Sequence, residues 1–106
     1  MENPFEEYKK ELDAELERYR QVLKAQNHDH FLTALVEIES QIEASRAQAQ
    51  SLYDEYMKKA EDAPHPAMAR LARRRAEILL QFNREATQAI LARFMEAAPP
   101  SFRIVG

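Results

Sequence analysis

The stretch between Asn27 and Asp62 constrains the fold more than any other part of the chain. It contains no glycine and no proline, and its apolar residues recur at alternating steps of four and three. This seam consists of Phe31, Leu35, Ile38, Ile42, Ala49, Leu52 and Tyr56, with Ser45 at its one gap. Heptad spacing of this kind predicts a long helix that packs along its length against another helix. At 1.5 Å per residue the helix is about 50 Å long, so its neighbours must also be long helices, or a second copy of the chain must help to cover it.

Glycine and cysteine are almost absent from the chain. Gly106 is the only glycine among 106 residues, and there is no cysteine. Phosphate loops, nucleotide-binding turns and many hairpin turns need glycine where φ is positive. Disulfides, thiolate metal sites and cysteine nucleophiles need cysteine. The composition therefore excludes a P-loop and a dinucleotide-binding fingerprint and argues against most β architectures.

A second amphipathic segment precedes the long one. Asn3 and Pro4 are typical of a helix start, as the N-cap and the first helical residue. Apolar residues then recur every three or four positions: Phe5, Tyr8, Leu12, Leu16, Tyr19 and Leu23. The pattern predicts a helix over about 4–26. We expect Asn27 or Asp29 to cap the next helix, over about 28–62.

Pro64 and Pro66 separate the second helix from a third, over about 66–97, which ends before Pro99 and Pro100. The apolar residues expected to form its packed face are Met68, Leu71, Ala72, Leu79, Phe82, Ala86, Ala89, Ile90 and Phe94. Short connections make successive helices antiparallel. The predicted fold class is therefore all-α, with three long antiparallel helices in an elongated, coiled-coil-like bundle. We expect one helical domain, 1–98, followed by an extended tail, 99–106.

Counting outward from each turn gives approximate helix registers. The third helix sets Ala86 and Ala89 beside Glu43 and Ser40, and the first helix covers only about residues 31–50 of the second. The end near Pro64 then contains two helices instead of three. Its apolar residues extend around more of the second helix than the third can cover: Leu52, Tyr53, Tyr56 and Met57. Exposing such side chains forfeits about 1.5–3 kcal/mol each, so the sequence predicts a homodimer through this surface.

The most distinctive cluster of charged residues is at the start of the third helix and contains four arginines: Arg70, Arg73, Arg74 and Arg75. Residues 28–62 carry eight acidic and three basic groups, and residues 63–106 carry three and seven. We therefore favour ion pairing with the second helix, with Arg74 and Arg75 beside Glu55 and Asp54. A protein partner is the next interpretation. A nucleic-acid contact comes third, because the four side chains point around more than half of the helix and the pI is about 5.6.

The sequence contains no metal-ligand or catalytic pattern that we recognise. His28 and His30 are two residues apart, on different sides of a helix, and His65 lies in the other connection. No glutamate is followed three residues later by histidine, as bundle di-metal sites require. We expect no metal, no cofactor and no enzymatic activity.

The last residues have a different pattern from the helices. Phe102 and Ile104 alternate with Ser101 and Arg103, and Val105 follows, which favours an extended strand. Two interpretations remain open for Phe102, Ile104 and Val105. They either fold back over the end of the first two helices near His28 or act as a docking peptide for a partner.

These features predict a protein that works by binding. No apolar run approaches 18 residues and the first residues do not resemble a signal peptide, so we expect no membrane association and a cytoplasmic location. The expected function is that of a helical adaptor, chaperone-like or assembly protein that binds another protein. The alternative is a nucleic-acid-associated regulator that uses Arg70–Arg75.

Overall fold

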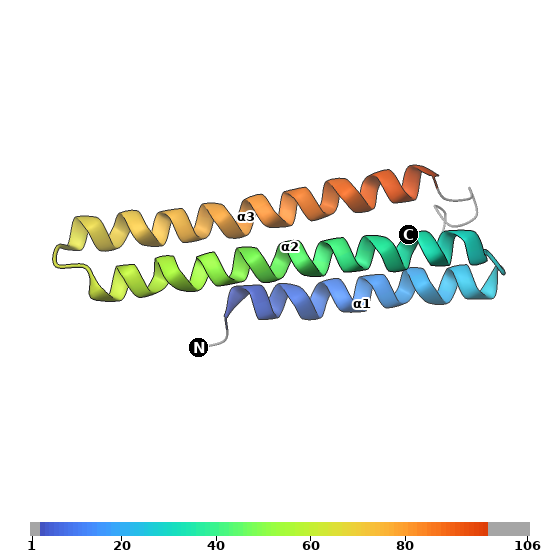
Figure 1. Ribbon diagram of the computed structural model, residues 1–106, viewed down its shortest axis with the longest axis horizontal. Coiled ribbons are helices and arrows are strands. Elements are labelled where there is room, and N and C mark those ends of the chain that lie inside the picture. Colours follow the sequence, from blue (N-terminus) through green and yellow to red (C-terminus); the bar gives the residue numbers. More distant parts are fainter. Residues whose placement is uncertain (1–2, 98–106) are drawn as a thin grey trace.

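The structure, a computed structural model, describes residues 3–97 and contains three helices in that range (Figure 1). They are α1 (Pro4–Ala25), α2 (Asp29–Asp62) and α3 (Pro66–Ala97). Successive helices are antiparallel, and the molecule measures 58 × 20 × 19 Å. The prediction of an elongated all-α fold is confirmed, and each helix boundary is within one residue of its expected position. The predicted tail, 99–106, lies outside the described residues.

The start of α1 is capped and tied to α2 by the same residue. The Asn3 side-chain oxygen accepts a hydrogen bond from the Phe5 amide at 2.9 Å, and Pro4 occupies the first helical position. The Asn3 amide nitrogen donates to Asp54 Oδ1, also at 2.9 Å. The same side chain therefore caps α1 and joins its start to α2.

The connection between α1 and α2 differs from the prediction. Asn27 adopts a left-handed conformation with φ of 56°, and its amide donates to the Lys24 carbonyl. The His28 amide donates to the Leu23 carbonyl at 2.9 Å. This Schellman arrangement ends α1, because asparagine tolerates positive φ better than most residues. Neither Asn27 nor Asp29 is the N-cap of α2: that position belongs to His28, which makes no side-chain cap bond.

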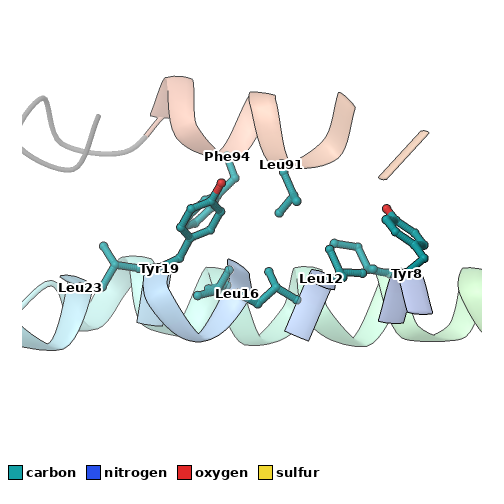
Figure 2. Close-up of a cluster of buried hydrophobic side chains, with 9 residues drawn as sticks. Tyr8, Leu12, Leu16, Tyr19, Leu23, Leu91 and Phe94 are labelled. Atoms are coloured by element: carbon teal, nitrogen blue, oxygen red, sulfur yellow. The ribbon is translucent and has the colours of Figure 1, made fainter. Parts of the chain in front are cut away.

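All three helices share a core only in the half of the molecule away from Pro64 (Figure 2). The buried cluster consists of Tyr8, Leu12, Leu16, Tyr19 and Leu23 of α1, Leu35 and Ile42 of α2, and Leu91 and Phe94 of α3. Toward Pro64 only α2 and α3 continue, as predicted. Because Phe5 contacts Tyr53, however, α1 covers α2 about one turn further than residue 50.

The line between α2 and α3 is built from small and polar side chains. Ala49, Ala60 and Ala76 are buried there. Asn83 Nδ2 donates to Ser45 Oγ at 3.3 Å, across the two helices. Side chains of this size let helix axes approach closely. The contact between Ser45 and Asn83 confirms the predicted α2–α3 register to within one residue.

The packed face of α3 is only in part the one that the sequence predicted. Asn83 and Thr87 face inward with Ala76, whereas Met68, Leu71 and Phe82 are exposed. Leu91 and Phe94 are held in the shared core, where the close-up shows them directed toward α1 (Figure 2). Because a helix is stiff, anchoring these two residues sets the rotation of the preceding turns. Thr87 and Asn83 then point toward α2, and Phe82 points away from it.

Candidate interaction surfaces

A row of large apolar side chains on α3 is exposed to solvent. It consists of Met68, Leu71, Ile78 and Phe82, which we call the α3 stripe. Their exposed fractions run from 51% for Ile78 to 69% for Phe82. Single exposed apolar residues are ordinary, but several large ones along the same side of a helix are typical of a binding surface. The α3 stripe is therefore the strongest candidate for a functional site among residues 3–97.

Sequence reasoning found most of these residues but assigned them to the core. Met68, Leu71 and Phe82 were grouped with the packed residues Ile90 and Phe94 as one face, and Ile78 was not included. The signal that separates them is the exact spacing. Ile78 follows Leu71 by seven residues and Phe82 follows Ile78 by four, whereas Asn83, Thr87 and Leu91 recur every four. Two inclined rows of this kind lie on different sides of one helix.

The four residues predicted as a dimer interface differ in their exposure to solvent. Leu52 is 45% exposed on α2. Tyr53 is half-buried, because the ring of Phe5 meets it edge to face. Tyr56 is half-buried, with Lys59 Nζ 5.6 Å from its ring centroid. Met57 is also half-buried, beside Pro4 and Tyr53. The interface itself stays a prediction.

An open groove of about 640 Å³ lies between α2 and α3 at the Pro64 end. Tyr56, Met68 and Leu71 contribute its apolar lining. Glu55, Lys59 and Arg75 are among the charged residues around it. This groove shares Met68 and Leu71 with the α3 stripe, so the two features form one continuous surface.

The four arginines are all exposed. Arg74 Nη1 lies 3.6 Å from Glu77 Oε2 of its own helix. Within residues 3–97, Arg70, Arg73 and Arg75 form no ion pair. Arg75 shares the groove with Glu55 but is not bonded to it. The expected pairing of Arg74 and Arg75 with Asp54 and Glu55 is therefore wrong, since these exposed side chains extend into solvent along α3.

The strongest charge contacts lie elsewhere, on α1 and α2. Arg46 is buried on α2 and donates to Glu43 and Gln50, and this hydrogen bond to Arg46 lowers the pKa of Glu43. Arg20 of α1 pairs with Glu17 and Glu39, and the bond to Glu39 raises the pKa of Arg20. Only the pair between Arg20 and Glu39 joins two helices, because the other contacts lie within α1 or within α2. Sequence reasoning missed Arg46, because a charged residue at helix spacing is normally exposed.

The histidines are dispersed along the molecule. The rings of His28 and His30 each contact the ring of Phe31, with centroids 6.0 and 5.5 Å away. His65 lies in the α2–α3 connection, where its carbonyl accepts from the Met68 and Ala69 amides at 3.1 Å. Across the described part of the chain, histidine and carboxylate groups do not gather in threes in a way that could hold a metal ion.

The remaining predicted interface residues, Phe102, Ile104 and Val105, lie outside the described residues, so both interpretations of the tail stay open. Residues 3–97 include no helix that is long and apolar enough to cross a membrane. Comparison of the chain with protein-family models, with curated proteins and with solved structures finds no match. The surfaces of the molecule are therefore what points to a function.

Proposed function

We propose that this chain is a non-enzymatic helical adaptor, chaperone-like or assembly protein that binds another protein chain through the α3 stripe. One observation supports the proposal above all: four large apolar side chains on one side of α3 are at least 51% exposed. Fully burying such a side chain contributes about 1.5–3 kcal/mol. Covering the four residues therefore supplies several kcal/mol toward association.

The border of the stripe also supports a protein partner. Glu55 and Lys59 lie beside its Pro64 end, and Arg75 and Glu85 lie within the row. An apolar centre with a charged border of both signs is typical of protein interfaces. A cytoplasmic location belongs to this proposal and agrees with a chain that has no cysteine to oxidise.

Capture from the host's lysate with three tagged baits tests the proposal. The baits are the wild-type chain, an Ile78→Glu/Phe82→Glu variant and a Val36→Glu control. Val36 is 56% exposed on α2, so the control places a glutamate at an exposed apolar position away from the stripe. We expect the wild type and the control to retain the same partner, which can be an untagged copy of the chain, and the double variant to lose it. Equal capture by all three baits contradicts the proposal.

A second candidate function is nucleic-acid binding, which is favoured by Arg70, Arg73 and Arg75, since these are exposed and form no ion pair with another described residue. Such binding is strongly salt-dependent, because each phosphate contact releases counterions. A mobility shift with duplex DNA at low salt that is lost in an Arg73→Glu/Arg74→Glu variant supports this function. The absence of any mobility shift at low salt contradicts nucleic-acid binding.

A further inference from the structure

The α3 stripe follows a heptad that is separate from the face packed against α2. Met68, Arg75, Phe82 and Ala89 recur every seven residues, and Leu71, Ile78, Glu85 and Ala92 follow each of them by three. Alternating steps of three and four along one helix form the seam of a helix pair. Because α2 already packs on another side of α3, the seam is suited to one additional helix.

Only two charges interrupt this seam, and their positions select a direction for the incoming helix. Arg75 precedes Ile78 by three residues, and Glu85 follows Phe82 by three. If a second α3 runs antiparallel with its Phe82 against Ile78, its Glu85 meets Arg75. If it runs parallel and in register, Arg75 meets Arg75 and Glu85 meets Glu85, which is repulsive. The seam is thus complementary to itself in the antiparallel direction.

The sizes of the apolar side chains agree with the same register. Leu71 precedes Ile78 by seven residues, and Ala89 follows Phe82 by seven, so Leu71 faces Ala89 of the second copy. By the same count Met68 faces Ala92. Large residues in one half of the seam therefore meet small ones in the other half, which is how a two-fold interface fits against itself.

Both charged residues are available for such a contact. Within residues 3–97, Arg75 forms no ion pair, and Glu85 accepts a single hydrogen bond, from Gln81 Nε2 at 3.2 Å. The neighbouring Arg84 points to α1 instead. Its Nη2 lies 3.7 Å from Glu11 Oε2, and its guanidinium lies 4.9 Å from the centroid of the Tyr8 ring. Helix α1 therefore packs mainly on another side of α3. The seam residues are exposed, and Glu85 also borders a groove that it shares with Pro4 and Arg84.

We propose that the partner of the α3 stripe is a second copy of this chain, paired antiparallel so that Arg75 of each copy faces Glu85 of the other. This inference rests on the proposed function, because it names the occupant of the same stripe. It places the dimer on α3, whereas the sequence pattern placed it on Leu52, Tyr53, Tyr56 and Met57 of α2.

A charge-exchange series measured by equilibrium sedimentation tests the pairing. We expect the purified wild type to be a dimer at micromolar concentration. Arg75→Glu and Glu85→Arg each create like-charge contacts, two per dimer, and should weaken dimerisation about tenfold or more. The Arg75→Glu/Glu85→Arg double variant should restore it, and an equimolar mixture of the two single variants should form a heterodimer. Arg73→Glu is the matched control, since position 73 lies on the side of α3 opposite the seam.

Cysteine cross-linking supplies an independent measurement, because the natural chain has no cysteine. A mixture of Leu71→Cys and Ala89→Cys chains should form a disulfide-linked pair under mild oxidation, since these positions face each other. Leu71→Cys alone should not, because in the antiparallel pair the two copies of position 71 are about 27 Å apart along the helix. This experiment still reads out the register if a charge variant fails to fold.

The outcomes separate this inference from the proposed function. A monomeric wild type at concentrations on the order of 100 μM, or a double variant and a mixture that both fail to restore the dimer, overturns the pairing. So does cross-linking of Leu71→Cys alone. If the pairing fails while the Ile78→Glu/Phe82→Glu bait still loses its partner from lysate, the proposed function stands with a different partner. If the pairing holds while all three baits capture the same other protein, the stripe serves self-association alone and the adaptor role proposed for it fails.

Discussion

The ring of Phe5 meets the ring of Tyr53 edge to face, with centroids 5.4 Å apart and planes inclined by 70°. Phe5 is fully buried, although it is the second residue of α1. The contact lies where the three-helix part of the molecule passes into the two-helix part. Phe5 therefore closes the end of the shared core, and Tyr53 is partly covered from within the chain.

We expect Phe5→Ala to lower the free energy of unfolding by about 3–5 kcal/mol, the usual cost of removing a buried phenyl ring. Urea unfolding followed by circular dichroism measures the change. Val36→Ala is the control, because Val36 is exposed on α2, and its stability should stay within about 0.5 kcal/mol of wild type. Similar losses for both variants are incompatible with the position of Phe5 in the core.

Asn83 is a polar residue in the buried line between α2 and α3. Its Nδ2 donates to Ser45, but within residues 3–97 its Oδ1 has no hydrogen-bond partner. We expect Asn83→Leu to raise the free energy of unfolding by about 1 kcal/mol, because an unsatisfied buried acceptor is replaced by an apolar group of similar size. Asn83→Asp should lower it by several kcal/mol, because it buries a charge. Denaturant unfolding compares the three proteins, and a loss for Asn83→Leu contradicts the reasoning.

Tyr19 should make the fold sensitive to alkaline pH. Burial, together with a 2.6 Å hydrogen bond from its hydroxyl to Glu15 Oε1, raises the pKa of Tyr19 to about 12. The folded state thus holds the proton more tightly than the unfolded state. This stabilisation is complete below pH 10 and is lost as the pH rises from about 10 to 12, amounting to about 2 kcal/mol.

The comparison of wild type with Tyr19→Phe isolates this effect, because the phenylalanine variant has no proton to lose at that position. The difference between their free energies of unfolding should change by about 2 kcal/mol between pH 9 and pH 12, to the disadvantage of the wild type. A difference that stays constant over this range shows that the pKa of Tyr19 is the same in the folded and unfolded states.

Glu43 should contribute stability that acid removes. The hydrogen bond from Arg46 lowers the pKa of Glu43, so its contribution is present above the pKa of the unfolded chain. It is lost as the pH falls through the lower pKa of the folded state. Because the Glu43 side chain is 53% exposed, solvent screening keeps the effect below about 1 kcal/mol. Glu43→Gln should therefore be less stable than wild type at pH 7, and the two should converge at acidic pH in urea unfolding.

Much of the fold could be predicted because the relevant signals are local. Asn3 and Pro4 start α1, Pro64 and Pro66 separate α2 from α3, and the near absence of glycine leaves few other breaks. Short connections then make the helices antiparallel and set their registers to within a turn. Asn27 is an exception among these local signals. Its left-handed conformation ends α1, whereas the sequence was equally compatible with Asn27 as the N-cap of α2.

The rotation of α3 was decided only by the tertiary structure. Its sequence carries two rows that both contain large apolar residues, one through Leu91 and Phe94 and one through Ile78 and Phe82. Periodicity cannot rank them, since each is a valid helix face. The choice depends on packing with residues far away in the chain: Leu91 and Phe94 join the core that α1 and α2 form. A stiff helix anchored at that end exposes Ile78 and Phe82 several turns away, and the candidate site results from that long-range constraint.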